Sequence, residues 1–509
     1  MALQLSEPHC QALNRQRRVA VNFDVGYPAN HLGMDVDEWI EFRFAFADEP
    51  GSHIDSLWWC LDEGNMALYP SKVIPEAQGP QARKWLDAGI DILKIALAAC
   101  RGRGLEAFYS YRVNGFDMEF TAAGEVDRSR KLPIVAEHPD WMIPSGWGPG
   151  PLFNFAVEGV RDYKVAILRE MAENYDLDGI DLFFARHPPC LPTGHQWEHR
   201  DCMTDFVRKT RHMLQEVAAQ RGRPLLLAAS VPATIPGCHY DGYDVETWVR
   251  ENLVDIFVIG VHSFEVDLDG FRRLVEDRHI KLYPCMDDHH HVPDGYPSPP
   301  IEIERGYAAN WWHQGADGIL TFNWANATLA ACKARDFPER PSAHQQAYHE
   351  IGDPDILRFK DKTFALTRRF GGGWEEWTGS KKWDFYHNLN IEAQLPTPLS
   401  DEQMPTLLTI YLADDLPANH ARIQRLDLKI QLKGLAVGDR IEAKLNGIIL
   451  ADPEATGDGW RVFRAAPSYF AQGRNLVYIV LDQRAPGATD PVTIEKLEVH
   501  VSYKNALDL

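Results

Sequence analysis

Short apolar runs alternate with amphipathic segments along the first two-thirds of the chain. The runs are apolar almost throughout, as expected for parallel strands that are covered on both faces. They predict strands at residues 18–24, 56–62, 105–112, 180–184, 225–232, 254–262, 281–287 and 318–324. Apolar residues at helical spacing predict helices at residues 81–103, 157–175, 203–220, 244–252, 268–278 and 302–314.

Eight strands, nearly all followed by a helical segment, fill about the length that a (β/α)8 TIM barrel needs. A doubly wound open sheet is the alternative. Its nucleotide-binding forms carry GxGxxG after the first strand or the motif GxxxxGK[ST]. In this sequence no GxGxxG follows the first predicted strand, and GxxxxGK[ST] does not occur. The pattern therefore favours the barrel.

The pattern changes after about Asp353. A charged segment, expected to be helical, runs to Arg369, and the three glycines Gly371–Gly373 are expected to end it. Short alternating strands follow, with Asn446–Gly447 as a turn, which is typical of an antiparallel β-sandwich. These strands are expected at residues 407–413, 426–432, 440–450, 476–481 and 492–503. The predicted division is a catalytic barrel at 1–350, a linker at 351–373 and an accessory β-sandwich domain at 374–509.

Charge narrows the choice of partners. The 509 residues carry a formal net charge of -21, which disfavours nucleic acid and anionic membranes as partners, because both attract basic surfaces. No apolar run reaches membrane-spanning length, and the first residues lack a basic start followed by an apolar core. The eight cysteines are scattered without a CxxC motif, which is usual for free thiols. The expected location is the cytoplasm, for a chain from which no leader has been removed.

The candidate chemistry lies at the predicted strand ends. In a parallel barrel the reactive groups gather where the strands end. The fourth strand carries Asp181, and Arg186 and His187 follow it before Pro188–Pro189 stop the strand. Side chains alternate along a strand, so Asp181 and Phe183 are expected on one side. The other polar exits give the remaining candidate substrate-binding residues: Asp24, Tyr111, Arg112, His239, His262, His289, Asn323 and Trp324.

Acids, histidines, arginines and tryptophans around one rim suit a carbohydrate site, because sugars present both hydroxyls and apolar C–H faces. Glycosidic cleavage needs two carboxylates. The catalytic candidates are Asp181, Glu265, Asp287 and Asp288. Structural alternatives are that Asp181 pairs with Arg186, that Glu265 is a solvated loop charge and that Asp288 caps a turn.

Two further features bear on the ligand. Arg112 and Arg186 leave adjacent strands, so both could bind carboxylate or sulfate groups on an anionic sugar. Trp324 is the expected sugar platform, whereas Trp311 and Trp312 lie in a helix and are expected in the core. The histidines near Asp287 could alternatively bind a divalent metal, but they lack a sharp ligand spacing, so no metal and no cofactor are predicted.

The segments GIDLFFARHPP, SVPATIPGCHYDGYDVETW, YPCMDDHHHVPDGY and GADGILTFNW resemble the bacterial glycosyl-hydrolase-like family 10 over roughly residues 18–330. The resemblance implies a (β/α)8 hydrolase that often carries a C-terminal β-sandwich. Related sequences read D-F-x-R-H-P at the fourth strand, where this chain has Phe183 in place of the aspartate. A catalytic aspartate is then expected from Asp181 or from another strand.

The expected function is hydrolysis of a glycosidic bond in an oligo- or polysaccharide, with anionic sugars among the candidates. The expected partner is the carbohydrate substrate, and self-association is left open. Two alternatives remain. One is a carbohydrate-binding barrel that has lost catalysis at Phe183, and the other is a metal-dependent hydrolase or lyase.

Overall fold

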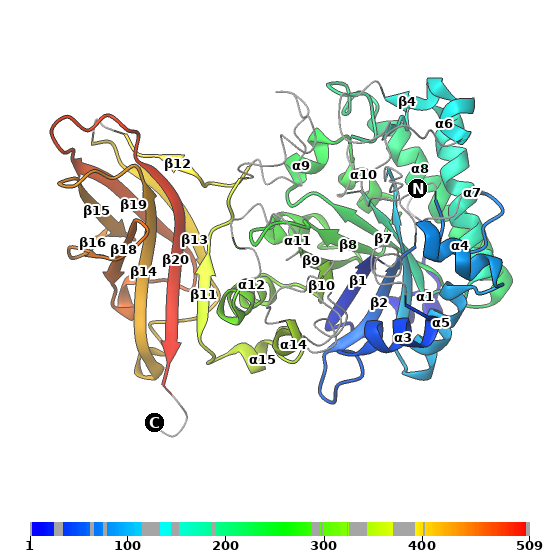
Figure 1. Cartoon of the computed structure of the whole chain (residues 1–509), viewed down its shortest axis with the longest axis horizontal. Helices are drawn as coiled ribbons and strands as arrows, with labels where there is room; N and C mark the ends of the chain where they lie inside the picture. The colour runs from blue at the N-terminus through cyan, green and yellow to red at the C-terminus, as the bar shows by residue number, and fades with distance from the viewer. Residues whose placement is uncertain are drawn as a thin grey trace.

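The computed structural model describes residues 3–24, 34–61, 66–74, 79–114, 133–143, 152–184, 189–287, 296, 299–322, 324, 344–369, 392–400 and 403–504. Eight parallel strands close into a barrel in the order β1-β10-β9-β8-β7-β6-β3-β2 (Figure 1). The (β/α)8 prediction is confirmed. The strands are β1 (Val19–Asp24), β2 (Ile54–Cys60), β3 (Glu106–Arg112), β6 (Gly179–Phe183), β7 (Leu226–Val231), β8 (Ile256–Ile259), β9 (Lys281–Asp287) and β10 (Ile319–Phe322).

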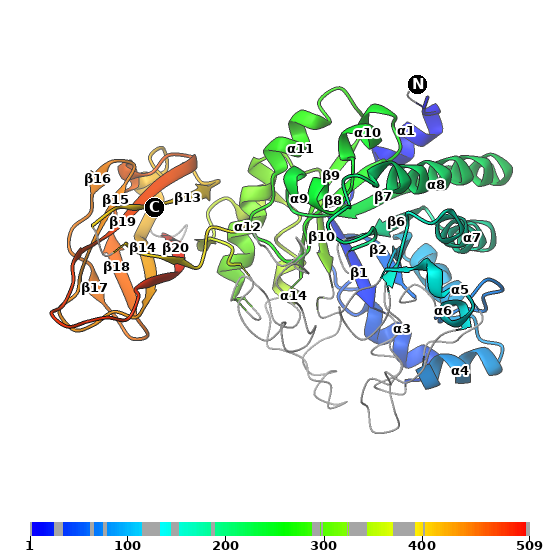
Figure 2. The same ribbon diagram turned by 90° about the horizontal axis from the view of Figure 1, so that it is seen from above.

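Helices surround the barrel (Figure 2). They are α1 (Glu7–Leu13), α3 (Val36–Phe44), α4 (Gly79–Asp87), α5 (Ile92–Gly102), α6 (Pro133–Glu137), α7 (Glu158–Asn174), α8 (Arg200–Arg221), α9 (Ile235–Tyr240), α10 (Val245–Arg250), α11 (Leu268–Leu274), α12 (Ile301–His313), α14 (His344–Ala347) and α15 (Pro354–Leu357). A short ribbon, β4 (Met142–Ile143) with β5 (Leu152–Phe153), lies in the long connection after β3. No described helix is both long and apolar enough to cross a membrane.

One segment that was predicted to be a single helix forms two helices. The segment 81–103 is divided between α4 and α5 at Gly89, which has a φ of 71° that a side chain would strain. Asp91 then begins α5 as its N-cap and accepts a hydrogen bond from Lys94 N at 3.2 Å. The apolar periodicity continues across this break, so periodicity alone could not reveal it.

The barrel interior contains both apolar and polar side chains, and it is closed at the end where the strands begin. Residues of alternating position fill it, among them Trp58, Phe108 and Cys285. At the closed end Arg17 is buried and donates hydrogen bonds to Glu106 and to the carbonyl oxygen of Leu13, the last residue of α1. The other end, where the strands finish, is called the open end below, and it is the end at which parallel barrels carry their reactive groups.

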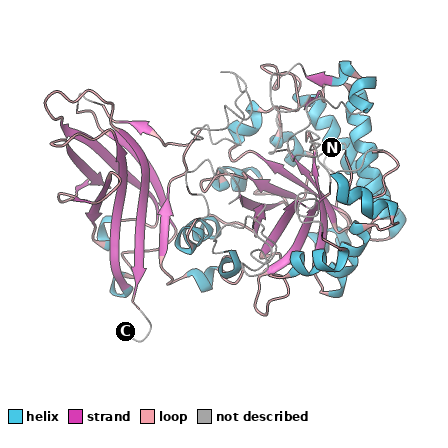
Figure 3. Cartoon of the chain, viewed as in Figure 1, coloured by secondary structure: helices cyan, strands magenta, loops and turns pink. Residues whose placement is uncertain are grey.

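The C-terminal region is an antiparallel sandwich, as predicted (Figure 3). One sheet has the order β11-β20-β14-β18-β17 with β12 beside β20, the other is β13-β19-β15-β16, and their inner faces share one apolar core. Both residues of the predicted Asn446–Gly447 turn have positive φ, 50° and 87°. The strands are β11 (Lys362–Ala365), β12 (Thr397–Pro398), β13 (Thr406–Leu412), β14 (Ile423–Lys433), β15 (Arg440–Leu445), β16 (Ile448–Ile449), β17 (Glu454–Ala455), β18 (Trp460–Arg464), β19 (Gly473–Gln483) and β20 (Thr493–Tyr503).

The expected linker does not have the expected form. Residues 354–357 make one short helix, α15, and β11 then joins the sandwich by pairing with β20, from Lys362↔Val501 to Ala365↔Glu498. The sheet thus begins before residue 374. Alternation of charged and apolar residues over so few positions fits a helix or an edge strand equally well, and the distant partner β20 decides the outcome.

The sandwich is fastened to the barrel through α12, which lies beside β11 (Figure 1). Asn310 of α12 donates to Tyr411 O at 2.9 Å and accepts from Ala413 N at 2.8 Å. Tyr296 adds a hydrogen bond from its hydroxyl to Glu498 Oε1 at 2.7 Å. The two domains are therefore joined by directional contacts as well as by the chain.

Gly306 has no side chain, which allows α12 to pack closely against β11. A Cβ atom there would lie 2.2 Å from Thr363 O, a backbone atom that cannot move aside alone. Alanine normally stabilises a helix relative to glycine, yet Gly306→Ala is expected to lower the free energy of unfolding by about 2 kcal/mol through overpacking. Gly102→Ala in α5, where nothing lies within 4 Å, is the matched control and should be neutral or stabilising. Denaturant unfolding of both variants is the measurement, and equal behaviour would contradict the packing argument.

Candidate active site

Asp287 and His262 meet at the open end of the barrel. Asp287 is the last residue of β9, and its N–H donates to Val261 O at 2.6 Å. His262 follows β8, the neighbouring strand, and its Nδ1 lies 3.2 Å from Asp287 Oδ2. Asp287 is 1% exposed and His262 is 7% exposed. The structure thus brings together two predicted site residues from different strands, and it limits the contact of water with the pair.

Asp181 lies deeper in the barrel, on β6, and is fully buried. Its two carboxylate oxygens accept hydrogen bonds from the Ser110 hydroxyl at 2.8 Å and from the Ser230 hydroxyl at 2.9 Å. Asn22 Nδ2 donates in turn to Ser110 Oγ at 2.7 Å. Burial raises the pKa of Asp181 to about 7, although both serine hydrogen bonds favour the charged form. This carboxyl is therefore held between its neutral and charged forms near neutral pH.

Three side chains form a layer near the open end of the barrel. Phe183 and Phe322 stack with ring centroids 4.9 Å apart, and the Arg112 guanidinium lies 5.7 Å from the centroid of Phe322. Phe183 follows Asp181 by two residues along β6, so alternation gives both the same side of the strand, as predicted. Arg112 pairs in register with Phe183 and is 2% exposed. The aromatic pair and Arg112 therefore lie nearer the strand ends than Asp181 does.

Cys285 is a buried residue of the barrel interior. Burial raises its pKa well above the usual value, and the nearby charges of Asp287 and Asp181 add to the effect. Both carboxylates are thus close enough to the Cys285 thiol to influence it. Cys285 and Asp287 stand two residues apart on β9, so alternation gives them the same side of the strand.

Glu265, a predicted catalytic carboxylate, lies at the junction with the sandwich. Its Oε2 accepts from Thr367 N at 3.0 Å, and Gln394 Nε2 lies 3.5 Å from its Oε1. Burial raises its pKa to about 7, while these two hydrogen bonds act in the opposite direction. It lines a pocket of about 220 Å³ together with Thr234, Ser263, Asp267, Thr367 and Glu392, among others. The structural alternative, a solvated loop charge, therefore does not fit Glu265, and its catalytic role stays a prediction.

Three predicted substrate-binding residues are engaged elsewhere. Tyr111 lies on the face of β3 opposite Arg112, in the outer core, with the Lys164 ammonium 5.5 Å from its ring centroid. Trp324 is 1% exposed and stacks on His344 at 4.2 Å, which covers one ring face, so it is not the open sugar platform that we expected. His239 of α9 bonds Glu246 Oε1 at 2.7 Å through Nε2. Trp311 is fully buried and Trp312 partly so, as predicted for core residues.

Several predicted residues lie outside the described part of the chain: Arg186, His187, Asp288, His289 and Asn323. For Asp24 only the backbone position at the end of β1 is described. The proposed pairing of Asp181 with Arg186 therefore stays a prediction. Within the described ranges, no group of three or more histidines, cysteines or acids has the geometry to bind a metal ion.

Sequence reasoning missed the residues that hold Asp181. Ser110 and Asp181 are register partners on β3 and β6, and Ser230 lies on β7, the next strand. Counting alternate residues back from the polar strand ends would have placed Ser110 and Asn22 on the inward face. The strand order is predictable from the barrel, so the signal for these residues is the set of inward-facing positions on neighbouring strands.

Comparisons with known proteins agree with the resemblance seen in the sequence. Residues 49–189 match the model of the family described as glycosyl hydrolase-like 10, a shorter stretch than the 18–330 expected. The match includes Arg112 and Asp181 but ends before Asp287. No curated protein matches the sequence.

Solved structures similar to the chain include glycosidases. An α-L-fucosidase of family GH29 from Bacteroides thetaiotaomicron has 11% identity and a TM-score of 0.39, with 97% of this chain and 96% of that chain covered. The α-L-fucosidase isoenzyme 2 from Paenibacillus thiaminolyticus has 13% identity and a TM-score of 0.42, covering 67% and 48%. The PgaB glycoside hydrolase domain from Bordetella bronchiseptica has 12% identity and a TM-score of 0.38, covering 64% and 100%. These are distant likenesses, and the fold assignment rests on the strand pairing.

Proposed function

We propose that this protein hydrolyses a glycosidic bond, with Asp287 as a catalytic carboxylate at the open end of the barrel. The observation that supports this most directly is the buried Asp287–His262 pair at the ends of β9 and β8. Reactive groups of parallel barrels come from such strand ends. The family match over residues 49–189 supports the same reaction class.

The geometry fits the needs of this reaction. The transition state of glycosidic cleavage carries positive charge on the sugar ring, and a carboxylate beside it either stabilises that charge or attacks the anomeric carbon. Asp287 is shielded from water, which strengthens its interaction with a charged ring. His262 lies at hydrogen-bonding distance from the carboxylate and can fix its orientation.

The remaining candidates for the second carboxylate are Asp181, Asp288 and Glu265, of which Glu265 is held at the junction with the sandwich by Thr367. A carboxyl with a pKa of about 7, such as that of Asp181, is suited to donate a proton near neutral pH. Its enclosure by Ser110 and Ser230 argues instead for a role in holding the inner layer of the site. We assign Asp181 this positioning role and propose Asp288, the residue after Asp287, as the partner.

The test is a hydrolysis assay on a panel of aryl glycosides and neutral and anionic oligosaccharides. Product formation is followed by NMR of the anomeric protons, which also reports retention or inversion. We expect turnover by the wild type on at least one sugar and strong loss in Asp288→Asn. Saturable sugar binding without turnover would overturn the proposal in favour of a carbohydrate-binding barrel.

A further inference from the structure

A threonine of the sandwich holds the loop that carries His262. Thr367 follows β11 and is 1% exposed. Its Oγ1 accepts hydrogen bonds from Phe264 N at 2.8 Å and from Glu265 N at 3.3 Å. Its own N–H donates to Glu265 Oε2 at 3.0 Å. The contact is reciprocal, because Thr367 both accepts from the backbone of this loop and donates to its side chain.

The same loop is fixed on its other side by the barrel. Phe264 O accepts from Trp311 Nε1 of α12 at 3.0 Å, and the Phe264 ring stacks on Tyr307 with centroids 5.3 Å apart. Within the loop, the Ser263 hydroxyl donates to Glu265 O at 2.6 Å. The segment 263–265 is thus held between α12 and Thr367.

Only Ser263 separates His262 from the residues that Thr367 holds. A shift of Phe264 N therefore reaches His262 through two peptide units, which are planar and stiff. His262 in turn lies 3.2 Å from Asp287 Oδ2, a distance that small displacements lengthen beyond hydrogen-bonding range. The sandwich is therefore connected to the candidate catalytic pair through a short path of directional contacts.

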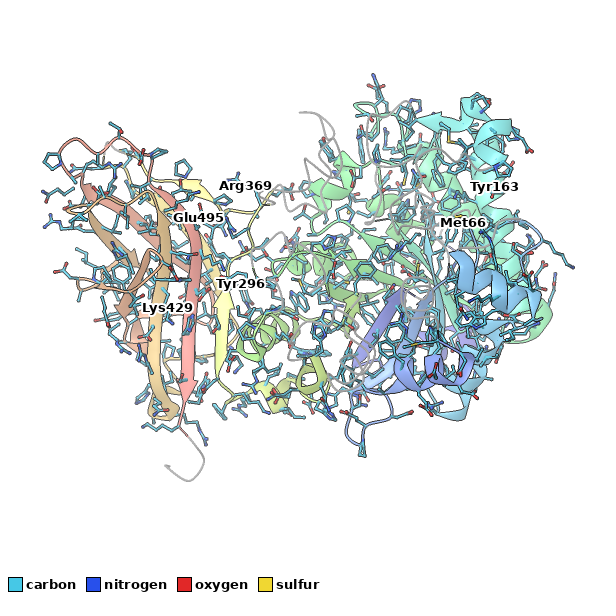
Figure 4. The ribbon with its side chains drawn as sticks, viewed as in Figure 1. Met66, Tyr163, Tyr296, Arg369, Lys429 and Glu495 are labelled. Atoms are coloured by element: carbon cyan, nitrogen blue, oxygen red, sulfur yellow. The ribbon has the colours of Figure 1, made fainter. Side chains whose placement is uncertain are left out.

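We propose that Thr367 is a positioning residue for the His262–Asp287 pair, so that the sandwich sets the geometry of the active site rather than serving only as an attached module. The inference rests on the proposed function for its catalytic consequence. Its structural part, the coupling of Thr367 to His262, stands independently. Figure 4 shows Tyr296 and Arg369 at the junction between the barrel and the sandwich.

The test compares substitutions at two contacts of the same junction. Thr367→Val keeps the side-chain shape but removes the acceptor, and Thr367→Ser retains it. Asn310→Leu is the matched control, because it removes the two hydrogen bonds to Tyr411 and Ala413 and leaves the hydrogen bonds between Thr367 and the loop in place. Hydrogen exchange of the Phe264 and Glu265 amides and the NMR signals of the His262 ring, assigned with His262→Gln, report on the loop without any substrate.

We expect Thr367→Val to speed exchange of the two amides by at least about tenfold and to move the His262 ring signals, with Thr367→Ser close to wild type. Asn310→Leu should leave both readouts unchanged. With a hydrolysed sugar in hand, Thr367→Val should lower kcat by about tenfold, change KM little and alter the pH profile of kcat, as small misplacements of reacting groups do.

Two results would overturn the inference. One is unchanged His262 signals in Thr367→Val despite faster amide exchange, and the other is an equal response in Asn310→Leu. If Thr367→Val does not fold, Glu265→Ala, which removes the acceptor of Thr367 N together with the weaker acceptor of Gln394 Nε2, must move the His262 signals or the idea fails. Absence of sugar turnover by the wild type would remove the proposed function while the NMR result still decides the coupling.

Discussion

Replacing Asp287 by asparagine is expected to lower kcat by at least ~10²-fold while the protein stays folded, the scale seen when a charge-stabilising or acid–base group is removed. Asparagine keeps the shape and the hydrogen-bonding oxygen but not the negative charge. Asp287 is buried, so water cannot supply the electrostatic stabilisation that the lost charge gave to the transition state. KM should change much less, because the lost interaction is strongest in the transition state. Steady-state kinetics on the best sugar of the panel is the measurement.

The matched control for this substitution is Asp267→Asn. Asp267 lies in the neighbouring loop and caps α11 through its hydrogen bond from Gly270 N at 2.9 Å, a role that asparagine fills equally well. Its kcat should stay near that of the wild type. If Asp287→Asn is active and Glu265→Gln is inactive, the junction carboxylate performs the chemistry and the assignment to Asp287 is wrong.

The barrel was predictable because its signal repeats. Each strand is a buried apolar run and each exit brings polar residues, so a misplaced boundary at one element does not change the topology. The sandwich was predictable for the same reason, through strand alternation and the Asn446–Gly447 turn. Elements without such repetition were missed. The break at Gly89 and the edge strand β11 depend on one backbone angle and on a distant partner, respectively.

The site was predictable only as far as the strands extend. Asp287 ends a strand, and its neighbour His262 follows the adjacent one, so the barrel register brings them together. Glu265 lies farther along the loop after β8, where its direction is set by Thr367 and Gln394, more than a hundred residues away in the sequence. Trp324 is likewise covered by His344 from a later helix. Contacts between distant loops leave no periodic signal in the chain.

Tyr111 shows a different failure. Its place near a strand exit predicts a role in the site, yet alternation along β3 gives Arg112 and Ser110 the inward face and Tyr111 the outward one. The same rule placed Asp181 and Phe183 correctly on one side of β6. Proximity to a strand end is therefore a weaker guide than the face on which a residue stands.

Asp181 should make the protein less stable as the pH rises towards 7. Its folded-state pKa of about 7 lies above the value near 3.9 expected for an unfolded aspartate. Between these two values the folded protein keeps a proton that the unfolded chain has released. The contribution to stability is therefore fully present below about pH 4 and is lost, by about 1.4 kcal/mol per unit, as the pH rises towards 7.

Asp181→Asn removes this titration. Asparagine is neutral at every pH, and the hydroxyls of Ser110 and Ser230 can turn to satisfy its amide group. From pH 5 to pH 7 the free energy of unfolding of the wild type should therefore fall by about 2 kcal/mol relative to that of the variant. Denaturant unfolding of both proteins at several pH values, followed by tryptophan fluorescence, is the measurement. Glu265 also has a raised pKa of about 7, but it is present in both proteins and its contribution cancels in the difference.

The serines provide a second check on the same carboxyl. Their hydrogen bonds favour the charged form of Asp181, so Ser230→Ala should raise its pKa further and extend the loss of stability to higher pH. In the Asp181→Asn background the serine substitution should leave the pH dependence unchanged, since no carboxyl remains to titrate. If the free energy of unfolding depends on pH in the same way in the wild type and in Asp181→Asn, Asp181 stays charged in the folded protein. That result would point to a cationic partner in the barrel and would return Asp181 to the candidates for a charged catalytic group.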